Sequence, residues 1–291
     1  MDDTGINRRG FATASLATGF ALAVLPVSAQ TIITDADDLD AGMVQVPVAG
    51  GATMAAYRAV PKRTGKGGHH PVVLVVQEIF GLHEHIRDLC RRLAKSGYYA
   101  IAPDLYFRQG DATKVPDIPT LIRDIVSKVS DAQVMADLDA TVAHLKTDNR
   151  ADTRRMAITG FCWGGRIVWL YSAHNPDLKA GAAWYGRLVG NTDADHPKNP
   201  IDLVDQLNAP VLGLYGAKDE GIPVASVDQM RTALAKGDKA ADASKLMVFP
   251  ESGHGFNADY RPSYNPVDAK IAWKQMLEWF KKHGVPYLPH T

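Results

Sequence analysis

Gly160-Phe161-Cys162-Trp163-Gly164-Gly165 has the Gly-x-nucleophile-x-Gly form of a strand-to-helix elbow, with cysteine where most such enzymes carry serine. The residues just upstream, 155–159, are typical of a short buried strand, and the apolar residues 167–171 downstream recur at helical spacing. A chain that turns abruptly from strand to helix needs small neighbours at the turn, and Gly160 and Gly164 supply them. The stretch therefore predicts a strand, a tight turn and a helix in succession.

At the tip of such an elbow the Cys162 side chain is exposed above the sheet. It lies next to a helix N-terminus, whose partial positive charge favours a thiolate. The alternative is a buried structural cysteine in a glycine-rich turn, and the rest of the chain has to decide between the two.

Composition excludes several classes of function. The 291 residues are 46% hydrophobic and 22% charged, which is ordinary for a globular protein. The 32 basic residues balance 32 acidic ones, so neither a nucleic-acid footprint nor a polybasic membrane patch is expected. No stretch after residue 30 is apolar for long enough to predict stable membrane insertion. Two cysteines, Cys90 and Cys162, cannot form a disulfide framework, and Cys90 has the spacing of a small core residue on a helix.

The first thirty residues resemble a bacterial twin-arginine export signal. Arg8-Arg9 and Phe11 precede a weakly hydrophobic run, 12–27, which ends in small residues suited to cleavage after Ala29. A buried N-terminal helix is the alternative, but the run is too uniform to give an amphipathic face. We expect residues 1–29 to be a signal peptide that engages the twin-arginine export machinery. The mature protein would then begin near Gln30 and work in the periplasm or outside the cell.

From residue 40 to residue 291 the chain is expected to form one domain. Strands alternate with helices, which predicts the α/β class with a mostly parallel sheet covered by helices on both faces. The first two strands suggest an antiparallel hairpin at a sheet edge, and Asp131 is a candidate helix cap. The expected strands are 44–48, 53–59, 72–77, 98–102, 155–159, 180–185, 211–215 and 245–249; the expected helices are 85–96, two within 117–146, one after Cys162, 224–236 and 266–283.

Two further residues follow predicted strands in the order that an α/β-hydrolase requires, which is nucleophile, acid, histidine. Asp219 comes after strand 211–215, and His254, flanked by glycines, comes after strand 245–249. Singly, each could be an ordinary loop residue, but the ordered set favours catalysis. His254 would act as general base toward Cys162, and Asp219 would hold the imidazole in the right tautomer. The Trp163 N–H is the first expected oxyanion donor, and a residue after strand 72–77 should supply the second.

Four segments together resemble the dienelactone hydrolases, or carboxymethylenebutenolidases: residues 77–82 (QEIFGL), 102–106 (APDLY), 160–165 and 253–256 (GHGF). The resemblance covers roughly residues 43–285. It implies an eight-stranded α/β-hydrolase fold that acts on enol-lactones from catechol catabolism. It also implies that the Ile79 N–H is the second oxyanion donor and that Glu78 helps to activate the cysteine. A carboxylate after an apolar strand is costly unless it is hydrogen-bonded or protonated, although backbone N–H groups could also hold Glu78 in a purely structural role.

The same resemblance suggests how the substrate is bound. Guanidinium groups bind carboxylates bidentately, and Arg108 matches one of the family's substrate arginines. The second family arginine is replaced here by Ala258, and Arg261 could substitute if its loop turns back. Arg166, Arg187 and the pair His83/His85 are interpreted as structural or surface groups. His69 and His70 are expected in a solvated loop rather than a metal site.

We therefore expect a monomeric exported hydrolase that cleaves a lactone or activated ester through a thioester on Cys162, with no metal or cofactor. One alternative is a broad esterase with the same triad, which the loss of the second arginine favours. A non-catalytic small-molecule-binding protein of the same fold is a second, against which the complete triad argues. A dithiol redox protein is a third, and the absence of a Cys-x-x-Cys motif argues against it.

Overall fold

A single sheet organises the molecule. The computed structural model describes residues 31–62 and 69–287, so the expected signal peptide, 1–29, lies outside the described residues. In the described part eight strands have the order β1-β2-β4-β3-β5-β6-β7-β8. The strands are β1 (Leu39–Pro47), β2 (Thr53–Pro61), β3 (His70–Val76), β4 (Tyr99–Pro103), β5 (Ala151–Phe161), β6 (Ala180–Trp184), β7 (Val211–Gly216) and β8 (Lys245–Phe249).

The pairing of these strands confirms the predicted α/β class. β1 and β2 form an antiparallel hairpin at the sheet edge, and β2 also pairs antiparallel with β4. All the remaining neighbours, from β4 through β3 to β8, are parallel. Because parallel strands all end at the same edge, the loops that follow β3, β5, β6, β7 and β8 are brought together there.

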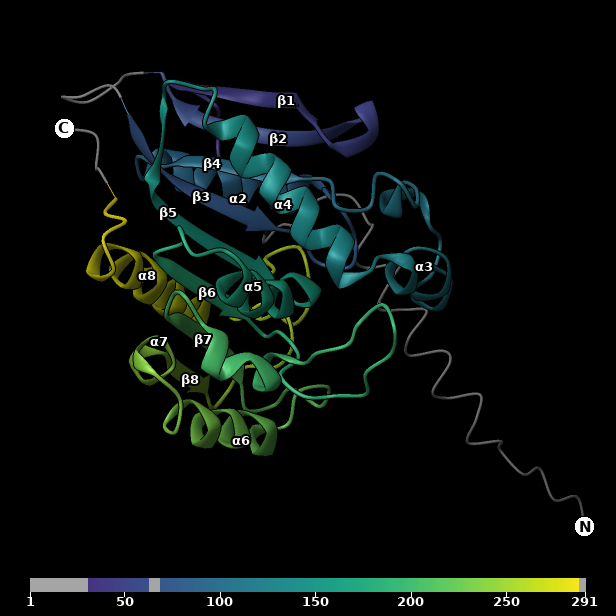
Figure 1. Cartoon of the computed structure of the whole chain (residues 1–291), viewed down its shortest axis with the longest axis vertical. Coiled ribbons are helices and arrows are strands. Elements are labelled where there is room, and N and C mark those ends of the chain that lie inside the picture. The colour runs from purple at the N-terminus through teal and green to yellow at the C-terminus, as the bar shows by residue number, and fades with distance from the viewer. Residues whose placement is uncertain (1–30, 63–68, 288–291) are drawn as a thin grey trace, which may run out of the picture.

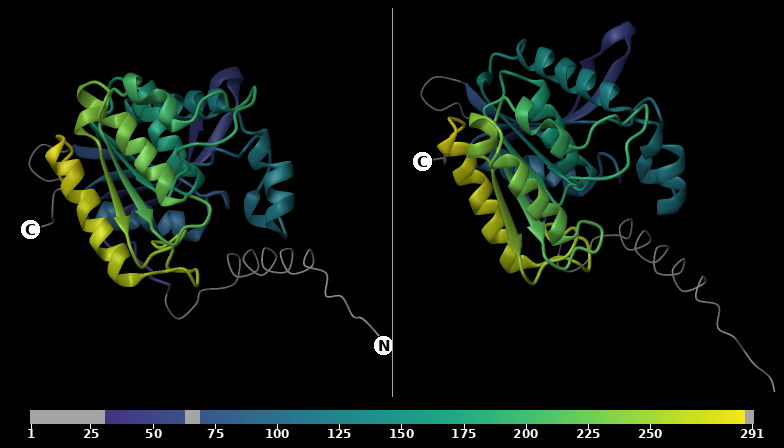
Figure 2. Two further views of the ribbon diagram at one scale, coloured as in Figure 1. Left: turned by 90° about the horizontal axis from the view of Figure 1, so that it is seen from below. Right: turned by 60° about the horizontal axis from the view of Figure 1, so that its bottom comes forward.

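Helices cover both faces of the sheet. α2 (Glu84–Lys95) and α8 (Pro266–Lys282) lie on one face, and α4 (Asp131–Leu145), α5 (Trp163–His174) and α6 (Val224–Leu234) lie on the other (Figures 1 and 2). Every residue of β3 is buried, as a continuous apolar run at the centre of such a sheet requires. Shorter helices are α3 (Ile118–Asp124) and α7 (Lys239–Ala243), and 3-10 turns lie at η1 (Ala49–Gly51), η2 (Ala112–Lys114), η3 (Val126–Lys128) and η4 (Pro200–Gln206). Among residues 31–62 and 69–287, none of the helices could cross a bilayer.

Three local expectations are wrong. Ser130, not Asp131, caps α4, since its side chain accepts a hydrogen bond from Gln133 N. Asp131 is instead paired with Arg166. The helical spacing of the sequence in α8 predicts that Ile271, Met276 and Phe280 are buried; Met276 and Phe280 are, but Ile271 is 44% exposed. His70 is not in a solvated loop: it begins β3 and is buried, with Nδ1 3.0 Å from Gly97 O.

Candidate active site

Cys162 lies at the junction of β5 and α5 with a strained backbone. Its φ of 56° and ψ of −114° are outside the regions that non-glycine residues normally occupy. Its N–H donates to Trp184 O at 3.0 Å, which fixes the turn to the end of β6. Strain of this kind persists only where the surrounding structure enforces it, and it is frequent at functional sites.

Two glycines make this turn possible, for reasons of space rather than flexibility. A Cβ on Gly160 would lie 2.3 Å from Gly164 O, and a Cβ on Gly164 would lie 2.5 Å from both Val76 O and Gln77 O. The start of α5 therefore packs directly on the end of β3. This close approach carries the Cys162 side chain to the sheet edge where the other loops converge.

Asp219 and His254 form the second part of the site. Asp219 follows β7 and is buried; its Oδ1 accepts hydrogen bonds from the backbone N–H groups of Gly221 (2.9 Å) and Ile222 (3.1 Å). Its Oδ2 lies 2.8 Å from Nδ1 of His254, which follows β8. With Nδ1–H engaged by the carboxylate, Nε2 is the nitrogen left to act on a substrate or nucleophile.

The charge around His254 favours its protonated form. Burial alone would lower the pKa of His254, but the adjacent Cys162 sulfur and the hydrogen bond to Asp219 raise it to about 10. A protonated imidazole beside a cysteine can stabilise a thiolate and later deliver a proton to a leaving group. The arrangement is thus able to perform nucleophilic catalysis.

Glu78 follows β3 and is fully buried, yet it is held in its charged form. The Tyr260 hydroxyl donates to Glu78 Oε2 at 2.6 Å, and His83 Nε2 lies 3.5 Å from the same oxygen. Burial would raise the pKa of Glu78, but His83 and the nearby Arg261 guanidinium lower it to about 2. Burial lowers the pKa of His83 itself, so at neutral pH the compensating charge comes chiefly from Arg261. The second oxygen, Oε1, has no hydrogen-bond partner among the described residues.

The loop that carries Tyr260, which we call the histidine loop (residues 250–265), is fastened to α2. Arg92 donates to the buried carboxylate of Asp259, and His85 Nδ1 lies 3.3 Å from the other oxygen of that carboxylate. Arg92 also contacts Asp88, which in turn accepts a hydrogen bond from Thr34 N at 2.6 Å. The N-terminal segment, α2 and the histidine loop are therefore joined by one chain of polar contacts.

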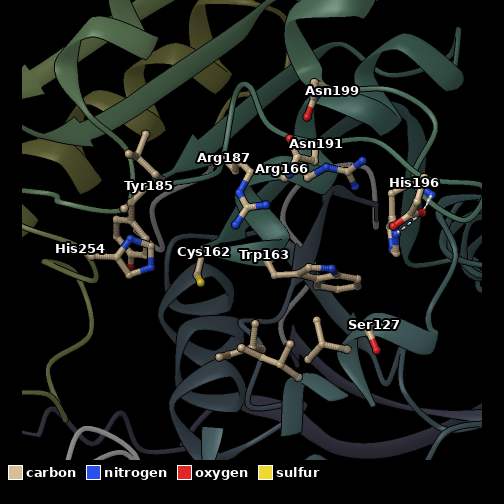
Figure 3. A pocket seen from close by; sticks show the side chains of 16 residues that line it. Ser127, Cys162, Trp163, Arg166, Tyr185, Arg187, Asn191, His196, Asn199 and His254 are labelled. Carbon is tan, nitrogen blue, oxygen red and sulfur yellow. Dashed lines mark hydrogen bonds and ion pairs between the residues drawn. The ribbon is translucent and has the colours of Figure 1, made fainter. Parts of the chain in front are cut away.

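Cys162 and His254 open into a cavity of about 380 Å³. Figure 3 shows the Cys162 sulfur between His254 on one side and Trp163 on the other. Asp219 and Glu78 do not line the cavity. Asp219 contacts the lining residue His254, and Glu78 directly precedes the lining residue Ile79 in the chain. The remaining lining residues are Ile79, Ile122, Val126, Ser127, Arg166, Tyr185, Arg187, Asn191, Asp193, His196, Asn199, Gly221 and Ile222.

The two backbone amides expected to bind an oxyanion are available. Neither Ile79 N–H nor Trp163 N–H donates to another backbone carbonyl in the turns and loops of the described chain. Both residues line the cavity beside Cys162. They come from the ends of β3 and β5, which are neighbours in the sheet.

The two arginines expected to bind substrate lie elsewhere. Arg108 forms a bidentate ion pair with Asp137 on α4, at 2.6 and 2.9 Å, and is not on the cavity wall. The histidine loop does turn back, since Arg261 N donates to Ala258 O, but the Arg261 guanidinium lies beside Phe80 and Gly255 instead of in the cavity. Its charge acts on Glu78. These positions therefore disfavour direct contact between either arginine and a substrate in the cavity.

Sequence reasoning missed three residues. Tyr260 had no motif to mark it, although it adjoins Arg261. Tyr185 packs its ring on His254 at 5.2 Å and has a φ of 38°. Arg187, which the sequence suggests is a structural or surface group, is exposed and lies on the cavity wall. The position of Tyr185 and Arg187 directly after a parallel strand was the only available signal.

Comparison with known proteins gives one consistent result. Residues 54–284 match the dienelactone hydrolase family. A provisionally named carboxymethylenebutenolidase of Methylorubrum extorquens is 57% identical, over 97% of this chain and 95% of that protein. One of Escherichia coli with the same provisional name is 54% identical, over 92% of this chain and 96% of that protein. The crystal structure of a provisionally named dienelactone hydrolase from Klebsiella pneumoniae has a TM-score of 0.79 and 56% identity, covering 84% of this chain and 99% of that one.

Proposed function

Because the chain belongs to the dienelactone hydrolase family and is a lactone or ester hydrolase, we propose that it uses a Cys162–His254–Asp219 triad and a covalent thioester. The observation that carries the proposal is the joint position of these three residues. Cys162 and His254 share one cavity, and Asp219 lies 2.8 Å behind His254. The proposed substrate class is a carboxymethylenebutenolide-type lactone or a small ester.

In the first half of the reaction the Cys162 thiolate attacks the acyl carbon. The carbonyl oxygen becomes an oxyanion, and in this proposal the N–H groups of Ile79 and Trp163 stabilise it. Collapse of this tetrahedral intermediate breaks the bond between the acyl carbon and the leaving oxygen. Protonated His254 gives its proton to that oxygen, and the acyl group remains on sulfur as a thioester.

In the second half His254 is neutral and accepts a proton from water. The resulting hydroxide attacks the thioester carbon, and collapse of the second oxyanion breaks the carbon–sulfur bond. The carboxylic product leaves, and Cys162 is again a thiolate beside a protonated His254. Asp219 keeps the imidazole oriented through both halves.

We assign Glu78 a role in keeping the nucleophile reactive. A fixed buried negative charge behind the elbow limits how strongly the Cys162 thiolate is stabilised, and so keeps the sulfur nucleophilic. This assignment makes Glu78 an electrostatic partner of Cys162 and not a general base toward water.

The decisive experiment compares wild type with Cys162→Ala and Cys162→Ser on dienelactone and on p-nitrophenyl acetate. We expect no turnover by the alanine variant, and an acyl adduct on wild type in acid-quenched samples analysed by intact-protein mass spectrometry. Equal turnover by wild type and Cys162→Ala would exclude the nucleophile assignment.

A broader esterase is the second candidate. Ala258 replaces one arginine that the family uses for substrate, and Arg108 is held by Asp137. Hydrolysis of p-nitrophenyl acetate with none of dienelactone would select this function.

Export and a monomeric state are further parts of the proposal. Export is supported by the twin arginine and the small residues before Gln30, and it would place any role in aromatic catabolism outside the cytoplasm. N-terminal sequencing of periplasmic protein should begin at or near Gln30, and size-exclusion chromatography should give the mass of one chain. Uncleaved protein confined to the cytoplasm would refute the first expectation.

A further inference from the structure

Among the described residues that line the cavity, Arg187 is the cationic side chain that no acidic group compensates. Among the described lining residues, the other arginine is Arg166, whose guanidinium is bound bidentately by Asp131 at 2.6 and 2.8 Å. The one lining carboxylate, Asp193, is engaged by His196. Arg187 is exposed and makes no hydrogen bond or ion pair with a described residue. Figure 3 shows its guanidinium extending toward the space between Cys162 and Asn191.

The backbone on both sides of Arg187 is fixed to the elbow. A Cβ on Gly186 would lie 2.3 Å from the carbonyl carbon of Gly165, so the main chain before Arg187 packs on the first turn of α5. Leu188, the next residue, is fully buried, and its carbonyl accepts a hydrogen bond from Ile201 N. The Cα of Arg187 is therefore held at a set position relative to the nucleophile.

The rim loop, residues 187–199, is also pinned where it borders the cavity. His196 Nε2 lies 3.0 Å from Val129 O, and Arg166 donates to Lys198 O at 2.7 Å. Asn199 Nδ2 donates to Gly190 O, and a Cβ on Gly190 would lie 3.1 Å from the Arg187 side chain. The side chain thus rests on a rigid loop, which reduces the entropy lost when it binds a ligand.

We infer that Arg187 is a specificity-determining residue that binds a carboxylate of the substrate while Cys162 attacks the acyl carbon. The inference rests on the proposed function and adds a residue to it. An uncompensated guanidinium inside a concave, largely apolar site attracts anions and pairs with carboxylates through two parallel hydrogen bonds. Arg187 reaches the cavity from the loop after β6, whereas the two arginines expected from the family resemblance are held outside it.

Alkylation of Cys162 tests this without requiring turnover. Iodoacetate and iodoacetamide have nearly the same size, and both form a carbon–sulfur bond with loss of iodide, but only iodoacetate is an anion. Cys90 does not compete, because it is buried and burial raises the pKa of its thiol. The measured quantity is the ratio of the two alkylation rates, followed by mass spectrometry at fixed pH and ionic strength.

We expect Arg187→Gln to lower the iodoacetate-to-iodoacetamide ratio about 10-fold, and Arg187→Lys to keep most of it. Arg108→Gln is the matched control, since Arg108 is an exposed arginine outside the cavity, and its ratio should equal that of wild type. An unchanged ratio in Arg187→Gln, an equal slowing of both reagents, or an equal fall in Arg108→Gln would each overturn the inference.

A pair of esters separates this result from the proposed function. For an anionic ester, mono-(4-nitrophenyl) glutarate, Arg187→Gln should raise KM about 10- to 100-fold with little change in kcat, while p-nitrophenyl acetate kinetics stay within about 2-fold. Loss of activity on both esters to the same degree would contradict a carboxylate-binding role. A wild type that favours iodoacetate yet hydrolyses neither ester would refute the triad and leave Arg187 as an anion site.

Discussion

Replacing Tyr260 with phenylalanine removes the hydroxyl that donates to Glu78 Oε2 at 2.6 Å and changes nothing else in the loop's covalent structure. The acceptor is a buried carboxylate, and its other oxygen already lacks a partner in the described chain. A hydrogen bond to a charged group contributes about 1.5–3 kcal/mol, and the loss is largest when the acceptor stays buried. We therefore expect Tyr260→Phe to lower the free energy of unfolding by about 2 kcal/mol at pH 7, which corresponds to a fall in Tm of roughly 4–8 °C.

The pH dependence of this loss has a defined sign. The pKa of Glu78 is lowered from 4.5 to about 2. The stabilisation that the charged Glu78 contributes is therefore fully present above pH 4.5, and it is lost as the pH falls from 4.5 toward 2. Tyr260→Phe weakens the binding of the charged form and so raises the pKa of Glu78. The difference in the free energy of unfolding between Tyr260→Phe and wild type should be constant from neutral pH down to about pH 4.5, and it should shrink below that pH.

A double-mutant cycle with Glu78→Gln isolates the contact. Urea unfolding of wild type, Tyr260→Phe, Glu78→Gln and the double variant should give a coupling energy of about 1–2 kcal/mol. Tyr264→Phe is the control, because the Tyr264 hydroxyl has no hydrogen bond in the described structure, and it should change stability by less than about 0.5 kcal/mol. A coupling energy near zero, or the same loss from Tyr264→Phe, would refute the reasoning that a charged Glu78 depends on Tyr260.

Three other perturbations test the site and its scaffold. Asp219→Asn should lower kcat by about 10³- to 10⁴-fold with little effect on KM, because His254 loses the partner that orients it; a kcat within about 10-fold of wild type would contradict this. The pKa of His254 is raised from 6.5 to about 10. The contribution of protonated His254 to stability is therefore complete below pH 6.5 and is lost as the pH rises through about 10. A pH profile of kcat/KM should accordingly fall on the alkaline side near pH 10, and in Asp219→Asn that limb should move to lower pH; a limb that does not move would exclude the carboxylate as the cause. Gly164→Ala would place a Cβ 2.5 Å from Val76 O and should destabilise the protein by about 3 kcal/mol or more, whereas Gly42→Ala, with open space around it, should change the unfolding midpoint little; equal thermal shifts would disprove the packing argument.

The sequence predicts well those parts of the molecule that local rules govern. A short, β-branched apolar run such as residues 72–76 favours a buried central strand, and the glycines around Cys162 mark a turn that no bulkier residue allows. The expected positions of Asp219 and His254 follow from the same logic, since loops after parallel strands must converge. In each of these cases the signal lies within about ten residues of the feature it predicts.

The expectations that the structure does not favour depend on partners distant in sequence. The family resemblance assigns Arg108 to substrate, whereas its guanidinium is held by Asp137, 29 residues away, a partner that no local pattern identifies. Asp131 is a good helix cap by residue type, but Arg166 occupies its carboxylate, and Ser130 caps the helix instead. The direction of Arg261 depends on how the histidine loop folds back toward Glu78, and no local pattern specifies that.

The polar chain from Thr34 through Asp88 and Arg92 to Asp259 also has a consequence for the order of folding. Its links join residues 54 and 167 positions apart, and contacts of such separation close late because the intervening chain must first be ordered. The loop that brings Tyr260 to Glu78 is held by the last of these links. A refolding molecule should therefore complete its sheet before it gains activity, and the recovery of catalysis should lag behind the recovery of tryptophan fluorescence.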